Sequence, residues 1–161
     1  MNEHKIKKRI RAVVLIFIIA LVFSGMTAYF IVPEANLLKT FTGNDNMLSV
    51  WINKAYNGIR DVNQNYPFIF YGTDWLAFGH LVIAIMFIGP YINPVRNKWV
   101  IQGGVFACIA VIPQVLITGY IREIPVFWQL FDCMFGILGI IPLLICLRLI
   151  RKMEQNKTSV S

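Results

Sequence analysis

The chain has 161 residues, of which 57% are hydrophobic and 14% charged, and its formal net charge is +7. This composition lies outside the range of ordinary soluble domains. Most of the apolar residues fall into four stretches, at about residues 12–32, 75–92, 99–121 and 125–147. Each is close to the roughly 20 residues that a helix needs to cross a bilayer. The length leaves no room for a second folded domain, so we expect residues 1–161 to form one four-helix transmembrane domain.

The apolar stretches must be helices if they cross a membrane, because the bilayer core offers no water to satisfy backbone N–H and C=O groups. Strands of a membrane barrel would be about ten residues long with alternating polarity, and these stretches are neither. The predicted fold is therefore an all-α integral membrane bundle of four transmembrane helices.

The first stretch, residues 12–32, follows a basic N-terminal segment and superficially resembles a secretory signal. Its apolar run is longer than the roughly 7–15 residues of a signal-peptide core, and no clean cleavage site follows it. We therefore predict an uncleaved first span.

Residues 33–73 form a long first loop that contains a predicted amphipathic helix. Apolar residues recur there at helical spacing, with Asn44 and Asp45 as candidate N-caps. These apolar residues are Leu48, Trp51, Ile52, Ala55, Tyr56 and Ile59. Such a helix is typical of a segment on the membrane surface. The alternative is a lid or a partner-binding helix at residues 45–60. Pro67 is expected to end any helix before the second span.

The basic residues predict the topology, because positive charge collects on the cytoplasmic side of membrane proteins. Eleven of the 15 basic residues precede the first span, separate the second and third, or follow the fourth. They are Lys5, Lys7, Lys8, Arg9, Arg11, Arg96, Lys98, Arg148, Arg151, Lys152 and Lys157. We expect both termini to be cytoplasmic and residues 33–73 external. A bacterial inner membrane fits this pattern, although an organellar membrane would look similar. The same distribution argues against nucleic-acid binding and for attraction to the lipid bilayer.

Four polar residues inside the spans are predicted to share one depth. Ser24, His80, Gln114 and Asp132 each lie six to eight residues from the outer end of a different span. At 1.5 Å per residue this is roughly 9–12 Å below the outer boundary. Polar side chains in a membrane usually face the bundle interior. The sequence therefore predicts a buried polar layer, which either holds the helices together or forms an outward-facing pocket.

Small residues mark the helix faces that we expect to point inward, because they let membrane helices approach closely. The predicted stripes are Gly103, Ala107, Ala110, Gln114 and Thr118 in the third span, Gln129, Asp132, Gly136 and Gly139 in the fourth, and Ala77, His80 and Ala84 in the second. At the outer rim, Asp74, Arg122 and Glu123 are expected to form salt bridges or, alternatively, to bind an anionic group.

Cysteine, metal and cofactor chemistry is not indicated by the sequence. The three cysteines lie at different depths and form no C-x-x-C pair; they are Cys108, Cys133 and Cys146. We therefore interpret them as free cysteines that act as small apolar side chains in the helix packing. A single histidine within the spans argues against a metal or bis-histidine haem site. We expect no cofactor.

Two classes of function follow from these features. The first is a small non-catalytic subunit or assembly module that binds a protein partner through residues 45–60. The second is a binder or transporter, and less readily an enzyme, that acts on a small molecule, proton or lipid through Ser24, His80, Gln114 and Asp132. A single four-helix bundle encloses little volume, so a homo-oligomer is a further expectation.

Overall fold

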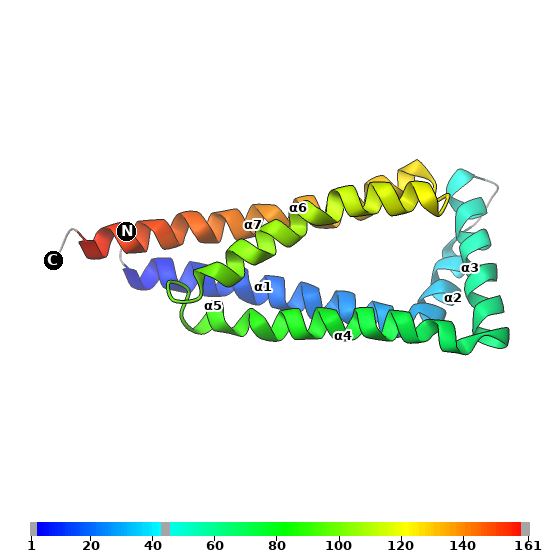
Figure 1. Ribbon diagram of the computed structural model, residues 1–161, viewed down its shortest axis with the longest axis horizontal. Coiled ribbons are helices and arrows are strands. Elements are labelled where there is room, and N and C mark those ends of the chain that lie inside the picture. The colour runs from blue at the N-terminus through cyan, green and yellow to red at the C-terminus, as the bar shows by residue number, and fades with distance from the viewer. Residues whose placement is uncertain (1–2, 43–45, 159–161) are drawn as a thin grey trace. The chain divides into compact units, whose positions relative to one another are not determined.

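The computed structural model describes residues 3–42 and 46–158, and every regular element in this part of the chain is helical. In chain order the elements are α1 (Glu3–Tyr29), α2 (Ile31–Phe41), α3 (Met47–Asn65), the 3-10 helix η1 (Pro67–Phe70), α4 (Tyr71–Met86), α5 (Ile88–Ile92), α6 (Lys98–Ile121) and α7 (Val126–Thr158) (Figure 1). The prediction of an all-α fold is confirmed.

Four helical segments of the described chain are long and apolar enough to cross a membrane. They are Glu3–Tyr29, Pro67–Ile92, Lys98–Ile121 and Val126–Gln155. Each contains most or all of one predicted span. The first ends earlier than predicted, because the helix is interrupted at Phe30 and α2 starts at Ile31. The chain is thus compatible with a membrane protein of four spans.

The segment predicted as a loop with a single helix contains two helices and a 3-10 turn. The predicted amphipathic helix is present as α3, but α2 was not predicted. Pro33 lies in the first turn of α2, where a proline is tolerated because its missing N–H has no helical partner. The predicted caps Asn44 and Asp45 lie outside the described residues. Asn46 caps α3 instead, in a capping box with Ser49.

The chain divides into two compact units. The first comprises Met1–Ala20 with Ala84–Ser161, and the second comprises Leu21–Ile83. The first unit therefore holds α6 and α7, and the second holds α2 and α3.

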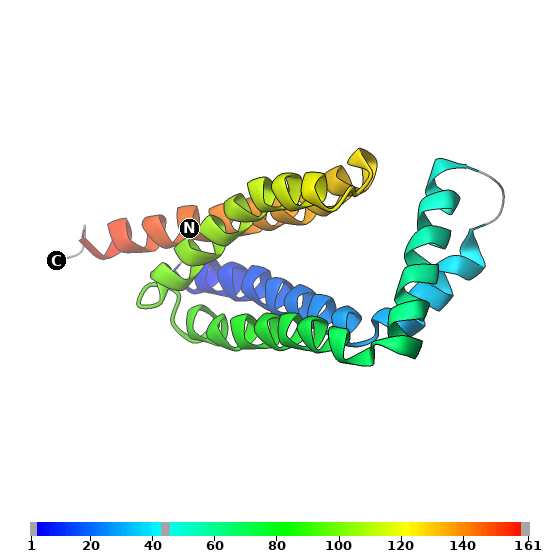
Figure 2. The same cartoon turned by 45° about the vertical axis from the view of Figure 1, so that its right-hand side comes forward.

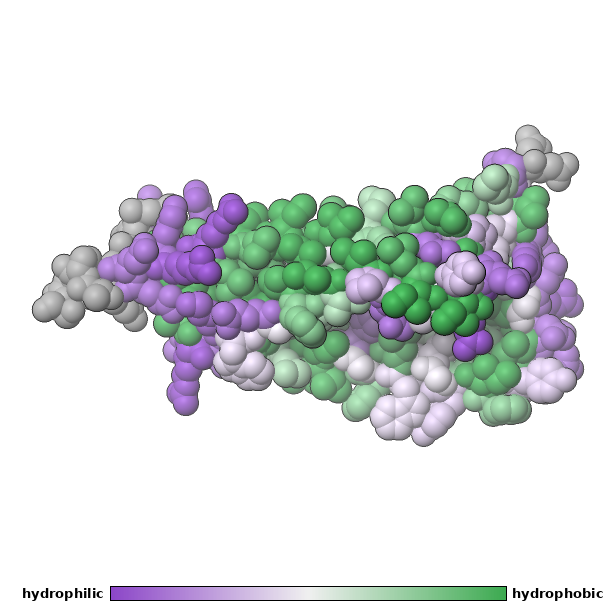
Figure 3. Space-filling view, turned by 45° about the horizontal axis from the view of Figure 1, so that its top comes forward, coloured by the Kyte–Doolittle hydropathy of each residue, from purple (hydrophilic) through white to green (hydrophobic). Residues whose placement is uncertain are grey.

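In the first unit, α6 and α7 pack side by side as an antiparallel pair (Figures 1 and 2). Glycines bring the two backbones together, as expected for helices in a membrane. A Cβ on Gly136 would lie 2.7 Å from the Cys108 carbonyl oxygen, and one on Gly104 would lie 3.0 Å from Leu143 Cδ1. Gly103 by contrast has nothing within 4 Å of its Cβ position. Hydrophobic residues cover most of the visible length of the pair (Figure 3).

The best-buried core of the first unit lies toward the basic end of its helices. Its side chains repeat at helical spacing along α1 and α7, and α6 contributes one more. They are Ile6, Ile10, Val14, Ile101, Leu143, Cys146, Ile150 and Met153. Two polar contacts lie at the same end of the unit. Lys98 Nζ forms an ion pair with a Glu154 carboxylate oxygen at 2.8 Å. Arg11 Nε donates a hydrogen bond to the Tyr91 carbonyl oxygen at 3.0 Å. The packed part of α7 thus continues past residue 147, where the fourth predicted span ends.

In the second unit, α2 and α3 form a helical hairpin (Figure 2). Ala35 of α2 and Ile52 of α3 are buried, and Trp51 and Tyr56 are half-buried. The apolar face predicted for residues 48–59 is therefore largely the face that α3 buries. Elsewhere in this unit, Gly25 of α1 packs against α4, because a Cβ there would lie 3.0 Å from the Ala77 carbonyl oxygen.

Candidate functional site

The four residues of the predicted polar layer lie on four different helices. Ser24 is on α1 and His80 on α4, both in the second unit, while Gln114 is on α6 and Asp132 on α7, both in the first. Each unit therefore supplies one pair of the layer. The meeting of all four residues stays a prediction.

Gln114 and Asp132 lie at nearly the same level of the α6–α7 pair. Gly119 packs on Gln129, since a Cβ on that glycine would lie 2.5 Å from Gln129 Cδ. From this contact, Asp132 lies three residues beyond Gln129 along α7. Gln114 lies five residues before Gly119 along α6, which runs antiparallel to α7. The axial offset is about two residues, or roughly 3 Å.

The two side chains of this pair occupy different surroundings. Asp132 is half-buried on the α7 face that carries Gly136 and Gly139, both of which pack on Cys108 of α6. Gln114 is exposed and lies on an α6 face other than the one that contacts α7. Among the described residues of this unit, no hydrogen bond joins Asp132 to another group. A half-buried carboxyl in an apolar helix with no partner in its own unit is the most unusual group of the layer.

Gln129, which the sequence placed on the inward stripe of the fourth span, has a structural role at the α6–α7 turn. Its side chain is buried, and its Nε2 donates to the Ile124 carbonyl oxygen at 2.7 Å. The turn also contains Glu123 at a φ of 54°, in the left-handed region. Because the Gln129 amide is engaged by this turn, it is not available to the polar layer.

Ser24 and His80 also lie at one level, because His80 packs beside the residue that follows Ser24. A Cβ on Gly25 would lie 3.1 Å from the His80 Cβ. The His80 Nδ1 is 2.8 Å from the Leu76 carbonyl oxygen, which can only accept, so Nδ1 is the donor. The other ring nitrogen, Nε2, is then the one that could accept a proton or a ligand hydrogen bond. Ser24 itself is exposed.

The predicted outer rim is also divided between the two units. Asp74 is exposed in the first turn of α4, and Arg122 is exposed directly after α6. Within its own unit, neither side chain forms an ion pair with any described residue. The salt-bridged rim cluster therefore stays a prediction.

The three cysteines are free thiols, with Cys133 and Cys146 buried and Cys108 half-buried. Cys108 contributes to helix packing, since its Sγ would lie 2.8 Å from a Cβ on Gly139. In the described residues, no three His, Cys, Asp or Glu side chains are grouped so that they could hold a metal ion.

A cavity that the sequence did not predict lies in the α2–α3 hairpin. Its volume is about 190 Å³. Two residues of α2 and five of α3 line it: Val32, Asn36, Tyr56, Ile59, Arg60, Asn63 and Gln64. The spacing of Arg60, Asn63 and Gln64 puts all three on one helix face, which was a signal in the sequence. The cavity itself could not be foreseen, because its other wall is the unpredicted α2.

Comparison with known proteins does not assign this chain to a family: no protein-family model, curated protein or solved structure matches it.

Proposed function

We propose that this chain is a multi-pass membrane protein that acts as a non-catalytic subunit or assembly module, with the α2–α3 hairpin as its docking element. The observation that carries the proposal is a group of exposed apolar side chains at the tip of the hairpin. They are Leu37 at 58% exposure, Phe41 at 79%, Met47 at 76% and Val50 at 62%. We refer to these four residues as the hairpin tip.

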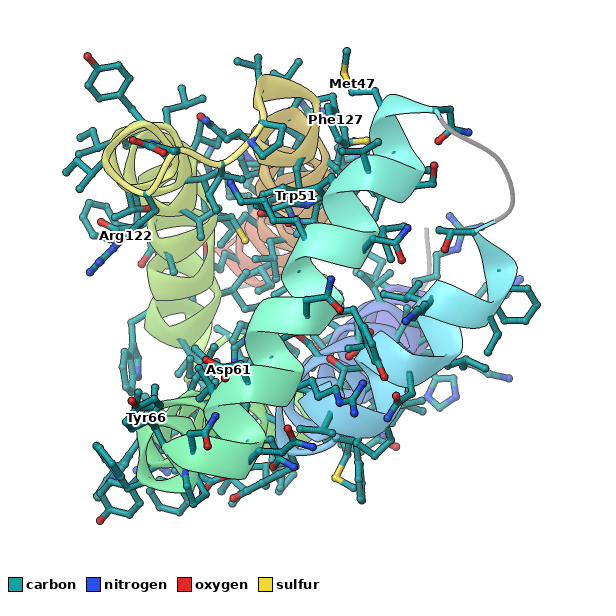
Figure 4. The ribbon with its side chains drawn as sticks, turned by 90° about the vertical axis from the view of Figure 1, so that its right-hand side faces the viewer. Met47, Trp51, Asp61, Tyr66, Arg122 and Phe127 are labelled. Carbon is teal, nitrogen blue, oxygen red and sulfur yellow. The ribbon has the colours of Figure 1, made fainter. Side chains whose placement is uncertain are left out.

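The hairpin tip is better suited to a protein partner than to the bilayer core. Neither α2 nor α3 is among the helices that could span a membrane. The hairpin also carries Lys39, Lys54 and Asp61, and charged groups are costly in hydrocarbon. Exposed apolar side chains rimmed by polar residues are typical of protein interaction sites. Figure 4 looks onto the hairpin, with α3 in front from Met47 past Trp51 to Asp61.

Site-specific photocrosslinking in cells tests this proposal. A photoreactive residue at position 41 or 50 should give one discrete adduct, because both positions belong to the hairpin tip. The same residue at Asn57, which is exposed on α3 outside the tip, is the matched control. Val50→Asp should abolish the adduct formed from position 41, whereas Asn57→Asp should leave it intact. Equal crosslinking from all three positions would refute a specific docking surface.

The proposed topology has the termini on the cytoplasmic side of a bacterial inner membrane and the hairpin outside. It is supported by the basic residues near the ends of α1 and α7. A reporter fused after residue 60 should be active only on the outer side. Activity on the inner side would reverse the orientation.

A second candidate function is binding or transport of a small molecule, proton or lipid through the polar layer. Asp132, with no partner in its own unit, and the free Nε2 of His80 favour it. Asp132→Asn and His80→Ala should then each abolish a cellular phenotype without lowering the amount of folded protein. Full complementation by both variants would leave the polar layer as a structural feature.

A further inference from the structure

The cavity between α2 and α3 has the composition of an anion site. Its lining holds the guanidinium of Arg60 and the side-chain amides of Asn36, Asn63 and Gln64, and no acidic residue. Among the described residues of the hairpin, no hydrogen bond or ion pair engages any of these four side chains. Their donors are therefore available to a ligand. An arginine fork with nearby amide N–H groups is well suited to the oxygens of a phosphate.

The electrostatics around the cavity point in the same direction. Lys39 lies with its Nζ 4.0 Å from the centroid of the Tyr56 ring, and Tyr56 is part of the cavity wall. The nearest acidic side chain in sequence, Asp61, accepts a hydrogen bond from Asn65 at 2.7 Å. The lining of the cavity thus holds one cation, Arg60, and no carboxylate, with Lys39 against its Tyr56 wall, which favours an anionic ligand over a cationic one.

The positions of the lining residues place the cavity next to the ends of two candidate spans. Val32 follows the first span, which ends at Tyr29, by three residues. Gln64 precedes the second span, which starts at Pro67, by three residues. Both walls of the cavity therefore start at the level where lipid headgroups lie. Val32 and Ile59 add an apolar part to the lining.

The size of the cavity limits the ligand. Its volume of about 190 Å³ is below the range of roughly 300–1,000 Å³ that is usual for drug-sized ligands. A phosphate group with a small substituent fits this limit, and a nucleotide cofactor does not. We propose that the α2–α3 cavity binds a phosphate-bearing anion, held by Arg60 with Asn36, Asn63 and Gln64. The source is either the headgroup of a phospholipid or a small soluble phosphate.

The first experiment counts phospholipid retained by the full-length protein. The protein is purified in mild detergent with phosphatidylglycerol, and bound lipid is measured by native mass spectrometry across a lipid titration. Arg60→Gln should weaken binding about tenfold or more, because it removes a charge-assisted contact. Lys54→Gln is the matched control, since it removes the same charge from the same helix but lies outside the cavity lining.

A second variant guards against a folding defect in Arg60→Gln. Asn36→Asp lowers the net charge by one, as Arg60→Gln does, but from the opposite wall of the cavity. Asn36 is exposed, so the substitution is compatible with folding, and it should also weaken phospholipid binding. Hydrogen exchange of α3 amides reports whether either variant perturbs the hairpin. Unchanged binding in Arg60→Gln, or an equal loss in Lys54→Gln, would overturn the proposal.

The second experiment identifies the source of the phosphate. Inorganic phosphate and glycerol 3-phosphate are titrated into delipidated protein and followed by isothermal titration calorimetry. Binding that Arg60→Gln removes supports a soluble phosphate, whereas retention of phosphatidylglycerol without soluble binding supports a lipid headgroup. Absence of both would refute the site. Neither outcome depends on a partner at the hairpin tip, so this proposal and the proposed docking function can fail separately.

Discussion

The two antiparallel helix pairs of this chain pack in opposite ways. In α6–α7 the backbones approach through Gly104 and Gly136, and the outer surfaces are apolar. In α2–α3 the helices leave a cavity of about 190 Å³ that is lined mainly by polar side chains. The first arrangement suits a pair surrounded by lipid, where close packing rather than the hydrophobic effect holds helices together. The second suits a pair in contact with water, where polar groups need not be satisfied by protein.

The largest expected effect concerns the end of α7 beyond the predicted span. Ile150 is fully buried there, so truncation to alanine would leave a cavity in the core. Ile150→Ala should therefore destabilise the first unit by about 2–5 kcal/mol. Unfolding in detergent measures this loss, with Lys152→Ala as an exposed control on the same helix. If Ile150→Ala lost less stability than Lys152→Ala, the C-terminal part of α7 would not be packed as in the structure.

The next effect tests the close approach of α6 and α7. Gly136→Leu would force a side chain against the Cys108 carbonyl oxygen and Val111, and should cost about 1–3 kcal/mol. Gly103→Leu is the matched control, because nothing lies within 4 Å of a Cβ at that position. Thermal unfolding of both variants in the same detergent provides the comparison. Equal losses of stability in the two variants would contradict Gly136 as a specific point of close approach between α6 and α7.

A smaller effect is expected at the start of α3. Asn46 accepts from the Ser49 backbone N–H at 2.8 Å and completes the capping box. Asn46→Ala should destabilise this helix by about 1 kcal/mol. The loss should appear as faster hydrogen exchange in the first turn of α3, with α6 and α7 unaffected. Exchange that rises equally in all three helices would contradict the local role.

The smallest effect is expected from the ion pair between Lys98 and Glu154. Their side chains are 28% and 38% exposed, so solvent screens the interaction. A double-mutant cycle with Lys98→Met and Glu154→Gln should give a coupling of at most about 1 kcal/mol, and high salt should reduce it. A larger, salt-independent coupling would indicate a buried pair.

The four long apolar helices could be predicted well because length and polarity suffice to define them. The third predicted span, residues 99–121, differs from α6 by one residue at its start. The ends were less predictable where helices continue outside the apolar run, as α1 does from Glu3 and α7 does to Thr158. Charged residues there were interpreted only as topology signals. Ile150 and Met153 show that this region also contributes to the core.

The candidate sites were predictable to different extents. The shared level of Ser24 and His80 follows from counting residues along spans, and the contact of Gly25 with His80 is consistent with it. The orientation of Gln114 was harder, because α6 contacts α7 through Gly104, Cys108 and Gly119 rather than through the predicted stripe with Gly103. The hairpin cavity was beyond prediction, since it needs the pairing of α3 with a helix that the sequence did not indicate.

The most direct test of the contrast between the two helix pairs is labelling by a membrane-impermeant thiol reagent in intact membranes. Asn57→Cys on α3 and Phe106→Cys on α6 are both exposed positions of the structure, and the unsubstituted chain reports the background from its three native cysteines. We expect rapid labelling at position 57 and protection at position 106 by lipid. Protection at position 57, or equal labelling at both positions, would contradict a water-exposed hairpin attached to a lipid-embedded pair.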